Sequence, residues 1–308
     1  MDLFLPQFIQ QLFNGLSLGA IYALIAIGYT MVYGIIGMIN FAHGEIYMIG
    51  AYVGLITLTA LGVGGNVPVP LLIMTMIVVA AFVTGCYGYA VERVAYRPLR
   101  NSARLVSLIS AIGMSIFLQN WVALGQGARD VAVPNILPGA FQIPLSDDFS
   151  VTITYARLLI IVVVFSLMVG LTLFIKKSRM GRASRACSQD MKMANLLGID
   201  TNKVISFTFI VGAVLAAVGG VLIAIAIGKL NPFIGFIAGI KAFTAAVLGG
   251  IGSIPGAILG GLILGVAETL AAAYISSQYK DIVAFSLLVL ILLFRPSGLL
   301  GKPEVEKV

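Results

Sequence analysis

The chain has 308 residues, of which 60% are hydrophobic and 10% carry a charge, and its mean hydropathy is +1.06. Soluble domains carry about 25% charged residues, so this chain has too little polar surface for water, and a soluble enzyme is excluded. The net charge of +7 does not indicate nucleic-acid binding, because the basic residues gather in two loops between apolar runs, at 93–104 and 176–203. Composition therefore predicts an all-α integral membrane protein.

Apolar runs of membrane-spanning length follow one another along the chain. A span needs roughly 20 apolar residues, because the hydrocarbon core is about 30 Å thick and a helix rises about 1.5 Å per residue. The runs lie at 9–33, 38–61, 68–91, 105–125, 155–175, 203–228, 234–252, 256–275 and 282–297. They predict a polytopic helical bundle of about eight to nine spans, which forms a single transmembrane domain over residues 1–308.

Two of these runs are interrupted by polar residues and glycines. Segment 34–50 carries Asn40, His43 and Glu45 among four glycines, and the run at 234–252 carries a lysine. Both are candidates for broken or re-entrant helices. Such backbone is tolerated at membrane depth where it is buried in protein or lines a cavity.

The basic loops predict how the chain is oriented. Cytoplasmic loops of membrane proteins carry an excess of Lys and Arg, so loops 93–104 and 176–203 are predicted to be cytoplasmic. Segment 126–154, which is polar and rich in proline, is then an irregular periplasmic loop and a candidate docking surface for an external protein.

A short internal match links the two interrupted segments. Phe41 and Gly44 are followed by Glu45 in the first segment, and Phe236 and Gly239 are followed by Lys241 in the second. The two units start on opposite sides of the membrane in the predicted orientation. This arrangement predicts an inverted repeat, which is common among transporters.

The buried charges carry further expectations. A charged group that faces lipid at mid-membrane costs roughly 2.5–3.5 kcal/mol, so we expect Glu45 to face the protein interior and Glu268 to pair with Lys241. For His43 and Glu45 two interpretations stay open: they line a path through the membrane, or they form a hydrogen-bonded pair that fixes a helix break. One His and one Glu do not make a closed metal site, so no metal is expected.

The basic loop contains a helical repeat of apolar residues. They recur at spacings of 4, 4, 3 and 3, which is one helical face: Ala183, Cys187, Met191, Ala194 and Leu197. An adjacent polar stripe consists of Arg182, Arg185, Gln189 and Lys192. The pattern predicts one amphipathic helix over 182–198, with Gly198 as its C-cap and Asp200 or Thr201 as the N-cap of the next span.

This amphipathic helix has two candidate binding surfaces, the membrane and a partner protein. A helix on the membrane surface would be attracted to anionic headgroups, but this apolar face is thin, which favours a groove in a partner protein. No Walker A motif accompanies it, since the Gly-Lys pairs at 228–229 and 301–302 lack the required spacing and the following Ser or Thr. Together these features indicate a membrane subunit that is driven by another protein.

Six stretches carry a resemblance to a known family. They lie at 20–30, 39–45, 92–98, 108–113, 179–199 and 241–252. Over essentially the whole chain the sequence resembles the LivH/LivM family, the permeases of bacterial ABC importers for branched-chain amino acids. The resemblance implies a multi-pass protein of the bacterial inner membrane that forms a heterodimer with a second, LivM-like permease. It implies leucine, isoleucine and valine as substrates, with phenylalanine as a further candidate.

The resemblance also implies further partners. Two cytoplasmic ABC ATPases would bind ATP and Mg, so no cofactor and no catalytic residue are expected in this chain, and a periplasmic binding protein would deliver the amino acid. The implied coupling residues are Gly181, Arg182, Ala183, Ala186, Ala194, Leu197 and Gly198. A zwitterionic substrate needs a few polar groups along its path, and the expected lining is Thr30, Asn40, His43, Glu45 and Thr244.

A secondary transporter that works alone is the alternative. It would need carboxylates for a coupling ion inside the membrane and would have no use for a partner-binding loop. Only Glu45 and Glu268 are available in apolar runs, and the loop is present. A membrane-embedded enzyme is a third class, but the chain has one His and no evident pairing of a nucleophile with a base.

Overall fold

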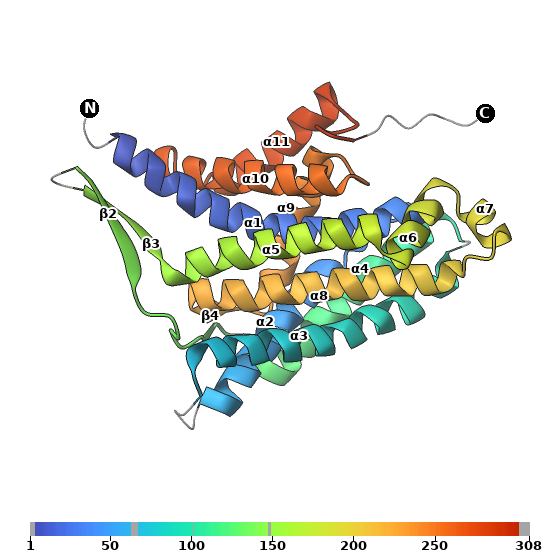
Figure 1. Ribbon diagram of the computed structural model, residues 1–308, viewed down its shortest axis with the longest axis horizontal. Coiled ribbons are helices and arrows are strands. Elements are labelled where there is room, and N and C mark those ends of the chain that lie inside the picture. The colour runs from blue at the N-terminus through green and yellow to red at the C-terminus, as the bar shows by residue number, and fades with distance from the viewer. Residues whose placement is uncertain (1–3, 63–66, 101, 147–148, 302–308) are drawn as a thin grey trace.

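Long apolar helices run side by side in the computed structural model, which describes residues 4–62, 67–100, 102–146 and 149–301 (Figure 1). The apolar helices are α1 (Phe4–Ile36), α2 (His43–Gly62), α3 (Val69–Val91), α4 (Arg104–Gln126), α5 (Tyr155–Lys177), α8 (Thr201–Ile227), α9 (Ile234–Gly249), α10 (Ile254–Tyr274) and α11 (Lys280–Phe294). Within these ranges seven helices are long and apolar enough to cross a membrane, whereas α9 (16 residues) and α11 (15 residues) are shorter. Each predicted run falls on one of the apolar helices, so the polytopic bundle is confirmed, but seven helices of spanning length are fewer than the eight to nine spans predicted.

The first interrupted segment is broken between α1 and α2. Helix α1 ends at Ile36, and Gly37 takes a φ of 69°, which a residue with a side chain rarely adopts. The helix resumes only at His43. Residues 38–42 are buried or half-buried, as non-helical backbone at membrane depth must be. The second interrupted segment is not broken: α9 is a single short helix of 16 residues.

The two ends of the bundle carry different structures (Figure 1). At one end, here called the hairpin end, β2 (Ala140–Ser146) pairs antiparallel with β3 (Phe149–Thr154), and β1 (Val131–Ala132) pairs with β4 (Lys229–Leu230). The opposite end carries α6 (Arg179–Gln189), α7 (Met191–Leu196) and the short helical turns η1 (Glu92–Tyr96) and η2 (Arg97–Leu99). The two basic loops therefore share one end, as predicted. The strands correct the expectation that 126–154 is irregular, and the side of the membrane that each end faces stays a prediction.

The helices before and after α5 form two related halves. Helix α1 runs from the hairpin end to the α6–α7 end, and α8 runs in the opposite direction. The contact between α1 and α10 corresponds to the contact between α8 and α3 in the other half. In the same way, the contact between α2 and α8 corresponds to the contact between α9 and α1. The matched glycines of the two segments meet where α2 contacts α9, since a Cβ on Gly239 would lie 3.1 Å from the Cα of Gly44. The packing therefore confirms the predicted inverted repeat.

Small residues allow the central helices to approach closely. Along α1, a Cβ on Gly15 would lie 2.7 Å from the Cα of Val266, and one on Gly19 would lie 2.8 Å from the Cα of Leu262. Close backbone contact of this kind stabilises helix pairs in lipid, where no hydrophobic effect drives them together. Helices α1, α2 and α8 form the buried centre, while α4 and α5 expose most of their apolar side chains.

Candidate substrate path and coupling surface

Glu45 lies in the first turn of α2, next to the buried break. Its side chain is fully buried, and Oε1 accepts a hydrogen bond from Ser115 Oγ at 3.1 Å. Among the described residues Oε2 has no hydrogen-bond partner, and it lies where a side chain on Gly235 of α9 would collide with it. The N-terminal end of a helix favours a negative charge, which accounts for a carboxylate at this position. The expectation that Glu45 faces the protein interior is confirmed.

His43 is buried beside α1 and is not hydrogen-bonded to Glu45. Its imidazole packs edge-on against the ring of Tyr29, with 5.0 Å between the ring centroids, and it occupies the space that a side chain on Gly28 would need. In the part of the chain that the structure describes, His43 Nε2 has no hydrogen-bond partner. The helix break is therefore fixed by packing against α1 rather than by a His43–Glu45 pair.

The other predicted path residues are buried in different environments. Asn40 Oδ1 accepts a hydrogen bond from the hydroxyl of Tyr96 at 2.9 Å, and Thr244 Oγ1 donates to the carbonyl of Ile240 at 3.0 Å. Thr30 Oγ1 has no partner within the described ranges. None of the five predicted path residues lines either of the cavities described below. Their part in a substrate path stays a prediction.

A buried charge cluster joins four helices. Lys241 Nζ of α9 lies 2.6 Å from Glu268 Oε1 of α10 and 2.7 Å from Asp281 Oδ1 of α11. The hydroxyl of Tyr22 of α1 donates to Glu268 Oε2 at 2.9 Å. The expected pairing of Lys241 with Glu268 is confirmed. Asp281 and Tyr22 were not predicted as partners, because nothing in the sequence brings these helices together.

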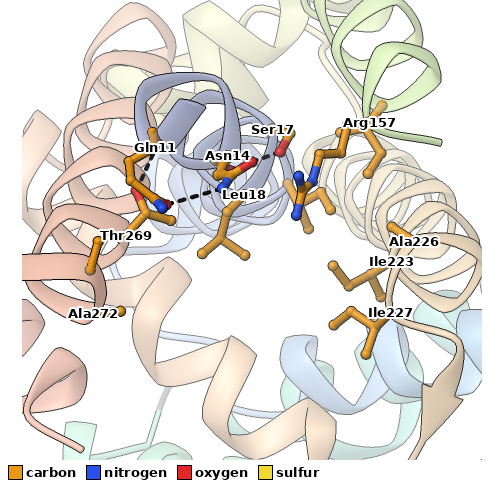
Figure 2. A pocket seen from close by; sticks show the side chains of 13 residues that line it. Gln11, Asn14, Ser17, Leu18, Arg157, Ile223, Ala226, Ile227, Thr269 and Ala272 are labelled. Atoms are coloured by element: carbon orange, nitrogen blue, oxygen red, sulfur yellow. Dashed lines mark hydrogen bonds between the residues drawn. The ribbon is translucent and has the colours of Figure 1, made fainter. Parts of the chain in front are cut away.

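Two adjoining cavities lie between α1 and α8 at the hairpin end, with volumes of about 400 and 430 Å³. They share Leu18, Ile21, Ile223 and Ile227. The first is also lined by α5 and α10. Figure 2 shows Arg157 of α5 on the same side of this cavity as Ile223 and Ile227, with Gln11 and Thr269 on the other side. The second extends to Tyr22 and Lys241 under α9.

Neither cavity was predicted from the sequence. Their walls come from segments that are far apart in the chain, and no spacing rule links them. One feature of the sequence could have indicated the first cavity. Arg157 is a basic residue at the end opposite the two basic loops, where basic residues are depleted.

The predicted coupling helix is wrong in one respect, because it is two helices. Helix α6 begins after Ser178, whose hydroxyl accepts from the backbone N–H of Gly181, and it ends at Gln189. Asp190 then caps α7 by accepting from the N–H of Met193 at 2.9 Å. The helical spacing continues across Asp190, so periodicity alone could not reveal the break.

The other capping predictions are confirmed. Gly198 has a φ of 84°, its N–H donates to the carbonyl of Asn195, and the N–H of Ile199 donates to that of Ala194. This is the Schellman arrangement that ends a helix. Asp200 caps α8 by accepting from the N–H of Lys203, and these hydrogen bonds hold the pKa of the carboxyl below its usual value.

The predicted apolar face is turned partly toward the chain itself. Of the predicted coupling residues, Gly181 and Ala194 are buried, Ala183 and Ala186 are half-buried, and Arg182, Leu197 and Gly198 are exposed. Cys187 is also buried, so it packs this segment onto the bundle. The apolar side chains that remain free on α7 and its C-cap are Met193 (54% exposed), Leu196 (81%) and Leu197 (76%). The coupling role of this segment stays a prediction, with its exposed face at these three residues.

Residues 11–292 match the family described as the permease component of branched-chain amino acid transport systems. The chain belongs to this family. It is 61% identical to the high-affinity branched-chain amino acid transport system permease protein BraD of Pseudomonas aeruginosa, and 60% identical to LivH of Escherichia coli K12. Each alignment covers 98% of this chain and 98% of the relative. The family resemblance is thus confirmed, and the chain is a multi-pass membrane permease.

A second permease of the same system is also similar to this chain. LivM of Escherichia coli K12 is 26% identical, over 94% of this chain and 70% of its own length. Its name assigns it to the same high-affinity branched-chain amino acid transport system as LivH. Two different permeases that are named for one transport system are therefore similar to this chain.

Proposed function

We propose that this chain is one of two non-identical permease subunits of an ABC importer in the bacterial inner membrane, with leucine, isoleucine and valine as substrates. Phenylalanine is a further candidate. The observation that carries the proposal is the match, at about three residues in five along nearly the whole chain, to permeases named for high-affinity branched-chain amino acid transport. A LivM-like subunit would be the partner in the membrane.

The α6–α7 end would receive the driving force from two cytoplasmic ATPases, which bind ATP and Mg, so this chain has no catalytic role. Met193, Leu196 and Leu197 form an exposed apolar patch, and Lys192 precedes it in the chain. An apolar patch at an aqueous end of a membrane protein suits contact with a partner. The buried residues Ala194 and Cys187 pack this segment against the bundle. A movement of α7 would therefore be transmitted to α8 through the short link 197–200.

The hairpin end would receive the loaded periplasmic binding protein. The β2–β3 hairpin exposes Phe141 (54%) and Ile143 (43%). The side-chain amide of Gln10 in α1 donates to the carbonyl of Thr152 in β3 and accepts from the N–H of Thr152. A partner that binds the hairpin is therefore linked directly to α1. Helix α1 is one wall of both cavities.

Affinity purification tests this assignment. A tagged chain extracted from native membranes should retain a LivM-like permease and two ATPases, and ATP hydrolysis by the complex should rise when leucine-loaded binding protein is added. Binding protein without leucine is the control. A chain that purifies alone and takes up leucine in response to an ion gradient would instead favour the secondary transporter.

A further inference from the structure

Arg157 is exceptional among the basic residues of this chain. Most of them lie at the α6–α7 end, whereas Arg157 is in the first turn of α5 at the hairpin end, half-buried in the wall of the 400 Å³ cavity. Within the described residues its guanidinium makes no ion pair, and no Asp or Glu lines this cavity. A guanidinium carries five donors that match a carboxylate in a bidentate geometry. The cavity therefore presents an anion-binding group without an anion.

The opposite polar wall offers hydrogen-bond acceptors. Asn14 donates to Gln11 Oε1 at 3.0 Å, and Ser17 donates to the carbonyl of Asn14 (Figure 2). Asn14 Oδ1 also accepts from Gln10 Nε2 at 3.1 Å. Each amide oxygen has two lone pairs, so the oxygens of Asn14 and Gln11 each keep one for a further donor. These bonds hold the acceptors in place, and acceptors held in this way suit an ammonium group.

The remaining wall is aliphatic. It is built by Leu18 and Ile21 of α1 together with Ile160 of α5 and Ile223 and Ile227 of α8. A volume of about 400 Å³ is at the small end of the range for ligand pockets, which is roughly 300–1,000 Å³. A cation, amide acceptors and branched aliphatic side chains around one small space match the three parts of an aliphatic amino acid.

We infer that this cavity binds the amino acid itself as it enters the permease. Arg157 holds the α-carboxylate, Asn14 and Gln11 accept hydrogen bonds from the α-ammonium, and the branched side chain lies on Ile223 and Ile227. The inference rests on the proposed function, because it names where that function's substrate first contacts this subunit. It also places this contact at the hairpin end, away from the buried residues at the α2 break.

Cysteine protection tests the site in the complete importer in detergent. The reporter is Ala226→Cys, which replaces an exposed residue of the cavity lining that is not assigned a contact with the substrate, in a Cys86→Ala background. Leucine should slow its reaction with a maleimide, whereas leucinamide, which keeps the ammonium and the side chain but has no carboxylate, should not. Arg157→Gln should raise the leucine concentration for half-protection about ten- to a hundredfold, the range for one charge-assisted contact. Arg157→Lys should fall between, because Lys cannot bind in a bidentate fashion.

Arg129→Gln is the matched control, since Arg129 is an exposed arginine at the same end and lies outside the cavity lining. It should leave half-protection unchanged. Equal protection by leucine and leucinamide overturns the proposal, and this comparison needs no substitution of Arg157. The proposal is also overturned if Arg157→Gln leaves protection unchanged but weakens binding of the loaded binding protein, since Arg157 would then contact that protein. An importer that pumps leucine without any protection keeps the proposed function and removes this site, whereas one that pumps no leucine removes the function.

Discussion

At the scale of single residues, Lys241 is a buried charge that lies between two carboxylates. It is 4% exposed and lies within 2.7 Å of two carboxylates from two other helices. Removing one partner from a buried ion pair leaves an uncompensated charge in a medium of low polarity. Lys241 therefore holds α9, α10 and α11 together, and its replacement should lower the stability of the bundle.

Lys241→Met should lower the free energy of unfolding by about 3–5 kcal/mol, because Glu268 stays buried without a cation. Lys229→Met is the matched control, since Lys229 pairs with Asp130 at 3.9 Å and both side chains are mostly exposed. An exposed pair of this kind contributes about 1 kcal/mol or less. Thermal unfolding of the purified permease measures both variants, and equal shifts in Tm would contradict the role of the buried cluster.

Cys187 should be inert toward thiol reagents in the folded permease. Its side chain is buried, and burial raises the pKa of the thiol. A raised pKa means that less of the reactive thiolate is present at neutral pH. In a Cys86→Ala background we expect slow maleimide labelling at Cys187. Ser188→Cys, one residue along on the exposed face of α6 and in a background without Cys187, should react rapidly, and equal rates would mean that α6 is turned differently.

At the scale of elements, the sequence predicted the membrane helices well, because length and hydropathy decide them. The break before α2 was also predictable from Asn40, His43 and Glu45, since polar groups cannot face lipid. The division of the coupling segment at Asp190 was not, because the apolar spacing continues across it. The β2–β3 hairpin was missed because 126–154 was interpreted from its polarity and prolines rather than from strand alternation.

Other parts of the site could not be predicted from the sequence, for a different reason. Ala194 was expected on the surface that contacts a partner, yet it packs against the chain's own core. An alanine at helical spacing fits equally well against a partner protein and against the chain's own core. The first cavity at the hairpin end is lined by residues of α1, α5, α8 and α10 that are far apart in the chain, and only the three-dimensional packing brings them together.

The two sides of α7 should respond differently to a negative charge. Leu197→Asp changes an exposed residue, so the permease should keep its Tm and lose co-purification of the ATPases. Ala194→Asp places a carboxylate in the core without a partner, which is strongly unfavourable, so both Tm and ATPase binding should fall. Size-exclusion chromatography with thermal unfolding separates the two effects. Full ATPase retention by Leu197→Asp would mean that this face is not the coupling contact.

At the scale of the whole molecule, the inverted repeat gives the permease a symmetric centre. The two halves meet at Gly44 of α2 and Gly239 of α9, where backbones touch without side chains between them. Close backbone contact of this kind packs two helices tightly where no hydrophobic effect drives them together.

Gly44→Ala should destabilise the bundle by about 1–3 kcal/mol, because overpacking forces backbone shifts. The added Cβ would collide with the backbones of Gly235 and Gly239, and no side-chain rotation can relieve this. Gly113→Ala is the control: its Cβ meets nothing within 4 Å among the described residues, so the exchange should be neutral or stabilise α4 by up to about 1 kcal/mol. Thermal unfolding measures both, and a neutral Gly44→Ala would contradict the close crossing of α2 and α9.

Leucine uptake by the reconstituted importer tests the central claim most directly. Proteoliposomes would contain this chain, the LivM-like permease and the two ATPases, with ATP and Mg enclosed and leucine-loaded binding protein outside. The account predicts uptake against a gradient that requires ATP, and that disappears when this chain is omitted or when Leu197→Asp uncouples the ATPases. Uptake by this chain alone, driven by an ion gradient and indifferent to ATP, would contradict it.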